Sequence, residues 1–326
     1  MQGNLSCGHT LTQKALTVNM ASMRIVSFLP AATEMIYLLG LGDDLVGRSH
    51  ECDFPEEVKL KPVIVDCALD LSSMTMGQID VAVSTQLAAG KSLYTVDEAK
   101  LRAAAPNLLV TQNLCQVCGP AGNEVSQVLK AMSDAPKIVW QTPRNFEEML
   151  DALRTLGRET GTEDKAVEWS AATTARITRI STATQALRKV RVSFLEWVDP
   201  IYCGGHWIPQ MLDWAGAEDR NSRAGADSVR IGWKQVLDYA PEVIVVSPCG
   251  FKTRDALAQA ALLKARAGWN DLPAVKNQRV YAVDANAYFA RPGPRLVDGV
   301  ELLAHLAHPE HFSWTGPADA YCVATD

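Results

Sequence analysis

The chain has 326 residues, 48% of them hydrophobic, which is enough apolar material for a large core divided between two globular units. The formal net charge is −6 and the sequence contains no run of Lys and Arg, so we expect no nucleic acid partner. The sequence also has no apolar stretch of about 18 residues or more, and we therefore expect no insertion into a membrane.

The first residues lack the continuous apolar run that a secretory signal needs, because Asn, Ser, Gln, Lys and Thr interrupt it. We therefore expect residues 1–22 to form a flexible tail. The chain contains eight cysteines, too few at this length for a disulfide scaffold, and we expect them to be reduced. Together these features predict a cytoplasmic protein.

Short apolar runs alternate with helical patterns in the first half of the chain. Strands are expected at 24–29, 45–49, 106–112 and 137–141, with a turn-like or strand segment at VAVST (81–85). Helices are expected after Pro30 and at 122–132. This alternation predicts parallel βαβ units.

The pattern from about 145 to 187 is helical and contains no strand. Gly161 is expected to end one helix and Thr162 to begin the next, with acidic residues on its positive end. We therefore predict a connecting helix at 163–188 between lobes at 23–162 and 189–315, with a C-terminal tail at 316–326. A single doubly wound sheet is the alternative.

Strands and helices alternate again after the connecting helix. The expected strands are 191–197, 242–248 and 279–285, and the expected helices are 208–216, 234–240, 253–270 and 296–309. Ligands of parallel α/β sheets bind outside the carboxyl ends of the strands. Six loops there carry unusual residues: FLPAATE, SHECDFP, TQNLCQVCGP, DPIYCGGHW, SPCGF and DANAYFARPGPR.

Four segments together resemble one known family: RIVSFLPAATEMIYLLGLGDDLVGRSHECDFPEEV (24–58), GHWIPQMLDWAG (205–216), PEVIVVSPCGF (241–251) and ANAYFARPGPRLVDGVELLAHLAHPE (285–310). They are similar to the helical-backbone periplasmic binding proteins that serve corrinoid and iron-siderophore ABC transporters, most of all to the cobalamin-binding, BtuF-like branch. The resemblance covers roughly residues 24–310. It implies an α/β fold of class III, in which two Rossmann-like lobes are joined by a long backbone helix and hold a ligand between them.

The first functional hypothesis is a binding protein for a corrinoid such as cobalamin, or a related metal chelate, with an ABC permease as a possible partner. Aromatic rings would cover the faces of the ligand, Arg291 would meet its polar groups, and His50 or His206 would approach the metal. For this family the expected location is periplasmic. The candidate ligand-binding residues are Pro30, His50, Glu51, Asp53, Gln112, His206, Trp207, Tyr288, Phe289 and Arg291.

The second hypothesis is a cytosolic metal-dependent enzyme or metal-handling protein on the same scaffold, holding an ion such as Zn directly. Thiolate and imidazole ligands suit a transition metal. The candidate metal ligands are His50, Cys52, Cys115, Cys118, His206 and Cys249.

Several of these residues also have structural interpretations. A lone CxxC at 115–118 is weak evidence for zinc, and its place before a helix also allows a redox pair. His50 could be a satisfied loop histidine, and Cys67 and Cys203 could be packing residues. Arg295 could pair with a nearby carboxylate.

Overall fold

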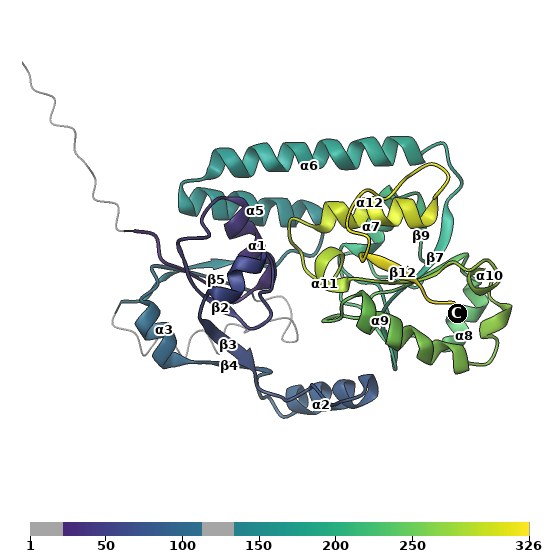
Figure 1. Ribbon diagram of the computed structural model, residues 1–326, viewed down its shortest axis with the longest axis horizontal. Helices are drawn as coiled ribbons and strands as arrows, with labels where there is room; N and C mark the ends of the chain where they lie inside the picture. Colours follow the sequence, from purple (N-terminus) through teal and green to yellow (C-terminus); the bar gives the residue numbers. More distant parts are fainter. Residues whose placement is uncertain (1–21, 113–133, 326) are drawn as a thin grey trace, which may run out of the picture.

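The computed structural model describes residues 22–112 and 134–325. Its β-strands form two separate sheets, one in each half of the chain, and not one continuous sheet. Figure 1 shows two lobes side by side with one long helix running along both. The predicted two-lobed α/β fold is therefore confirmed, and the alternative of a single sheet is wrong.

The sheet of the N-terminal lobe has the strand order β4-β3-β2-β1-β5-β6. All its pairings are parallel except the pairing of β4 with β3. The predicted helix at 122–132 lies outside the described residues. The elements of this half are β1 (Ile25–Ser27), α1 (Pro30–Leu38), β2 (Leu45–Ser49), η1 (Glu56–Leu60), β3 (Val63–Cys67), α2 (Met76–Ala88), β4 (Tyr94–Val96), α3 (Glu98–Ala104), β5 (Leu108–Thr111), β6 (Lys137–Trp140) and α5 (Phe146–Thr160).

The sheet of the C-terminal lobe has the order β12-β11-β10-β7-β8, and β9 pairs separately with β7. Strands β7, β10 and β11 are parallel. The elements of this half are β7 (Val190–Val198), β8 (Ile201–Cys203), α7 (Ile208–Trp214), β9 (Ala217–Glu218), α8 (Trp233–Tyr239), β10 (Val243–Val246), α9 (Thr253–Ala260), η2 (Ala261–Ala265), η3 (Trp269–Asp271), α10 (Pro273–Lys276), β11 (Val280–Val283), α11 (Ala285–Tyr288), α12 (Leu296–Ala307) and β12 (Tyr321–Val323).

The connecting helix is α6 (Glu163–Thr184), which starts where the sequence predicts. Gly161 ends the preceding helix with φ of 70°, a left-handed value that glycine adopts without strain. Along its length α6 packs against α5 of the first lobe and against α7 and α12 of the second. Lys165 donates to the Leu39 carbonyl at 3.0 Å in one lobe, and Arg176 binds Asp298 at 2.6 Å in the other. The helix is thus attached to both lobes.

The structure differs from the sequence-based prediction in several places. Residues 81–85 belong to α2 and not to a strand, because Thr75 and Gln78 form a capping box that starts a helix there. The predicted helix at 253–270 divides into α9 and two short 3-10 segments. The expected C-terminal tail contains β12, which pairs antiparallel with β11 so that Cys322 lies opposite Ala282.

Candidate ligand-binding site between the lobes

A cavity of about 680 Å³ lies between the two lobes, within the size range of small-molecule sites. Its walls come mostly from residues at or after the ends of β1, β2, β3, β5 and β6 on one side and of β7, β10 and β11 on the other. The carboxyl ends of parallel strands in both sheets therefore face one space, as the sequence predicts. The described polar and charged residues in its wall include Ser49, His50, Glu51, Ser72, Gln112, Gln141, Asp255, Gln259, Asn286 and Arg291.

Five of the predicted ligand-binding residues line this cavity. They come from four loops, which the fold brings together from both lobes. Cys249, one of the predicted metal ligands, also lies in the wall. The five are Pro30, His50, Glu51, Gln112 and Arg291.

Asp53 does not line the cavity but joins the lobes beside it. Its Oδ1 lies 2.5 Å from Nη1 of Arg291, and Nη2 of Arg291 donates to the Glu51 carbonyl at 2.9 Å. Burial raises the pKa of Asp53, but the charge and hydrogen bond of Arg291, together with the charges of Lys252 and Arg295, outweigh this effect and hold the pKa below its ordinary value. The guanidinium of Arg291, which belongs to the C-terminal lobe, therefore binds groups of the N-terminal lobe.

A second arginine, Arg295, donates from Nε and Nη2 to the two carboxylate oxygens of Glu34 in α1, at 2.9 and 2.5 Å. Burial raises the pKa of Glu34, which the charges of Arg295 and Arg291 partly offset. The pairing of Arg295 with a carboxylate is the structural interpretation proposed from the sequence. We call the contacts of Arg291 and Arg295 with Glu34, Glu51 and Asp53 the arginine seam.

The three predicted aromatic ligand residues are packed into the core instead. Trp207, Tyr288 and Phe289 are at most 6% exposed. The indole Nε1 of Trp207 donates to the Phe289 carbonyl at 2.7 Å, which satisfies its only polar group. These rings stabilise the C-terminal lobe and do not line the cavity.

His206 lies in the loop between β8 and α7, which contributes no described residue to the cavity wall. Its Nε2 lies 3.0 Å from Oδ1 of Asp227, and its ring stacks on Trp207. Burial lowers the pKa of His206, although the Asp227 charge raises it. His206, predicted as a ligand residue, is therefore not among the described residues that line the cavity.

Cys52 is turned into the core and lies 3.0 Å from the hydroxyl of Thr33. Burial raises the pKa of this thiol to about 11, so it is protonated at neutral pH. Cys115 and Cys118 lie outside the described residues. Within residues 22–112 and 134–325, no three His, Cys, Asp or Glu side chains are arranged to hold a metal ion, so the predicted cluster does not form there.

The structure adds residues that the sequence interpretation missed. Tyr94, Trp197 and Phe251 supply aromatic surface to the cavity, and the rings of Trp197 and Phe251 meet edge to face at 5.6 Å. Gln141 and Asn286 add side-chain amides. Each of these five except Tyr94 stands at the end of a strand or just after one, so the strand-end rule contained the signal for four of them.

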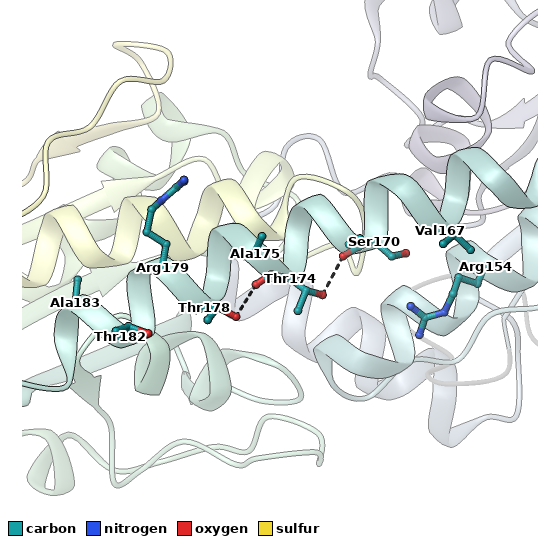
Figure 2. A pocket seen from close by; sticks show the side chains of 10 residues that line it. Arg154, Val167, Ser170, Thr174, Ala175, Thr178, Arg179, Thr182 and Ala183 are labelled. Atoms are coloured by element: carbon teal, nitrogen blue, oxygen red, sulfur yellow. Dashed lines mark hydrogen bonds between the residues drawn. The ribbon is translucent and has the colours of Figure 1, made fainter.

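A larger hollow of about 890 Å³ runs along the outer side of α6, but it is shallow and open. Figure 2 shows that small side chains line it, with Arg154 and Arg179 at its margins. The Thr174 and Thr178 hydroxyls donate to backbone carbonyls one turn earlier, at 2.9 Å in both cases. The hollow is an open surface, whereas the interlobe cavity is more enclosed and lined from both lobes, so the interlobe cavity remains the candidate site despite its smaller volume.

The model of the family described as "Periplasmic binding protein" matches residues 25–287. The chain belongs to the periplasmic binding protein family. This confirms the family resemblance seen in the sequence, and proteins of the BtuF type are among the relatives and solved structures to which the chain is similar.

Relatives agree with this assignment over most of the chain. An uncharacterized ABC transporter substrate-binding lipoprotein, YvrC of Bacillus subtilis, is 29% identical over 91% of this chain and 83% of its own length. The vitamin B12-binding protein of Vibrio parahaemolyticus is 23% identical over 87% and 89% of the two chains. Both similarities extend through the two lobes.

Solved structures confirm the fold. The vitamin B12-binding protein BtuF of Vibrio cholerae superposes with a TM-score of 0.64 at 20% identity, over 88% of this chain and 96% of that chain. The haem-binding protein RhuT from Roseiflexus gives 0.67 at 19% identity, over 89% and 99%. At this level of identity the likeness extends to the fold, and proteins with different chelates share it.

The relatives do not support the cytoplasmic location expected from the first residues, since they are periplasmic proteins by family or lipoproteins by name. No helix within the described part of the chain is long and apolar enough to cross a membrane.

Proposed function

We propose that this protein binds a corrinoid in the interlobe cavity and presents it to an ABC permease on the outer side of the membrane. We choose a corrinoid as the ligand because of the polar groups in the cavity wall. The wall contains four side-chain amides from both lobes, which can donate and accept hydrogen bonds: Gln112, Gln141, Gln259 and Asn286.

Charge favours the same ligand class. The described wall holds two carboxylates, Glu51 and Asp255, and one guanidinium, that of Arg291. That guanidinium already binds Asp53 and the Glu51 carbonyl. A haem brings two carboxylates, and such groups are best held by arginines with free donors. A corrin ring brings mostly neutral amides, which match neutral amide partners.

The aromatic and aliphatic surface suits the flat faces of a macrocycle. Trp197 and Phe251 lie on the side of the C-terminal lobe, and Tyr94 on the side of the N-terminal lobe. A macrocycle between the lobes would bury its faces against these rings. His50 is also in the wall and is the imidazole best placed to approach the metal.

The test is a titration of the purified protein with cyanocobalamin, cobinamide, haem and Zn²⁺, followed by absorbance and calorimetry. We expect saturable binding of a corrinoid with one site per chain, and weaker binding of haem. Tighter binding of haem than of either corrinoid would contradict the proposed ligand while leaving the family intact. Binding of Zn²⁺ alone would favour the metal-site hypothesis.

A further inference from the structure

The segment between β3 and β4 leaves its own lobe. We call residues 69–88, which include α2, the α2 arm. The only buried residue of α2 is Met76, and it packs with Leu195 and Val198 in a core cluster of the C-terminal lobe. Figure 1 shows α2 set apart from both sheets, on the side of the molecule opposite α6.

Polar contacts hold the start of α2 to the other lobe. The carboxylate of Asp80 accepts a hydrogen bond from the Tyr202 hydroxyl at 3.1 Å and one from Nη2 of Arg230 at 2.6 Å. The indole of Trp197 lies 3.4 Å from the Met76 carbonyl. We call the contacts of Asp80 with Tyr202 and Arg230 the arm latch.

The inner side of the arm is a wall of the cavity. Its lining residues are mostly apolar, so they contribute surface and not hydrogen bonds. Any movement of the arm away from the C-terminal lobe would open the cavity. The residues of the arm in the wall are Leu69, Leu71, Ser72, Met74, Ile79 and Val83.

The arginine seam and the arm latch are two of the polar connections between the lobes, and they differ in exposure. In the arginine seam, the side chains of Arg291 and Arg295 are 9% and 19% exposed, and that of Glu34 is 4% exposed. In the arm latch, the side chain of Arg230 is 55% exposed and that of Asp80 is 13% exposed. Exposed ion pairs are weak, whereas breaking a buried pair leaves an uncompensated charge. The arm latch, which is made by the α2 arm in the cavity wall, is therefore the weaker of these two connections.

We propose that the α2 arm is the gate of the cavity. It releases from the C-terminal lobe at Asp80 to admit or discharge ligand, while the arginine seam and α6 hold the lobes in place. This inference rests on the proposed function only in taking the cavity as the ligand site. It does not depend on which chelate binds.

Cys67 is a reporter of this movement, because it is half-buried at the base of the arm and lines the cavity. The experiment measures the alkylation rate of Cys67 by a maleimide in the full chain, resolved by mass spectrometry. It also measures amide hydrogen exchange in residues 69–88. The variants are Asp80→Ala, which removes the acceptor of the latch, and Asp80→Asn, which removes its charge.

The matched control is Lys234→Ala, which breaks an exposed pair with Asp238 within α8, away from the arm. We expect Asp80→Ala to raise both rates about three- to tenfold, Asp80→Asn to raise them less, and Lys234→Ala to leave them unchanged. Rates unchanged in Asp80→Ala would overturn the proposal. A rise spread equally over both lobes would also overturn it, because the variant would then have loosened the whole fold.

A corrinoid added to the same measurement separates this proposal from the proposed function. Protection of Cys67 by cyanocobalamin, together with faster labelling in ligand-free Asp80→Ala, supports both. Faster labelling without protection by any corrinoid supports the gate and contradicts the corrinoid. Protection with no effect of Asp80→Ala contradicts the gate alone.

Discussion

Arg291 and Asp53 stand 238 positions apart in the chain and form a direct ion pair between the lobes, with 2.5 Å between Nη1 and Oδ1. Arg291 is 9% exposed in its side chain and also lies near Glu34 and Glu51. The seam therefore places one guanidinium among several carboxylates, so its removal leaves them without this shared partner.

We expect Arg291→Ala to reduce the free energy of unfolding by about 3 kcal/mol, because Asp53 and Glu34 lose a counter-charge that is itself buried. The measurement is urea unfolding at neutral pH. Lys234→Ala, which breaks an exposed pair, should cost less than about 1 kcal/mol. Equal losses in the two variants would show that the seam contributes no more than a surface ion pair.

Glu196 should make the protein less stable as pH rises. Burial raises the pKa of its carboxyl group to about 7, and the hydrogen bond from the Gly205 amide only partly offsets this effect. The pKa in the folded protein is above the ordinary value, so the neutral form is favoured by folding. The stabilisation is present below about pH 4.5 and is lost as pH rises through 7.

Glu196→Gln keeps an acceptor for Gly205 and removes this titration. Compared with the unsubstituted protein, its relative stability should increase by about 2–3 kcal/mol between pH 4.5 and 8. Unfolding of both proteins across this range checks the prediction. His206, whose pKa is lowered, has the opposite pH dependence, but it is present in both proteins and largely cancels. A difference that stays constant with pH would contradict the prediction.

The thiols of Cys52 and Cys249 should differ in reactivity. Cys52 is buried with its pKa raised to about 11, whereas Cys249 is exposed in the cavity wall. Because the thiolate is the reactive form, iodoacetamide at pH 7.5 should label Cys249 while Cys52 stays unmodified until the protein unfolds. Peptide mass spectrometry reads both sites in one sample. Early labelling of Cys52 would place it outside the core.

Asn286 and His206 provide a matched test of where the ligand lies. Asn286 is an amide of the cavity wall, and His206 is not in the wall. Asn286→Ala should weaken corrinoid binding about 5- to 30-fold, the loss of one or two hydrogen bonds, while His206→Ala should change it less than about twofold. Calorimetric titration of the two variants decides this. The reverse order would move the site toward the loop between β8 and α7.

The fold was predictable because its signals are local. The strand at Ile25–Ser27, the helix starting at Pro30 and the glycine end of α5 at Gly161 are each visible in a few neighbouring residues. The strand-end rule then located the loops of the cavity. The sequence of the 81–85 segment was ambiguous, and the capping box before it decided in favour of a helix.

The orientation of side chains within those loops was not predictable. His50 faces the cavity, but Cys52, two residues later, faces the core beside Thr33. Trp207 is a core residue whose indole N–H donates a hydrogen bond to the Phe289 carbonyl, 82 positions away. Such choices depend on partners that are distant in the sequence, and this also applies to the contact of Asp80 with Arg230.

The strand β12 has a consequence for the solution behaviour of the protein. It covers the outer edge of β11, where Tyr281 pairs with Val323. An uncovered edge strand exposes unpaired N–H and C=O groups that can bind the same edge of another molecule. A three-residue antiparallel strand leaves little of its own edge for such pairing. Shortening the chain before Tyr321 should therefore promote aggregation by edge-to-edge association, even though the residues of the cavity would all remain.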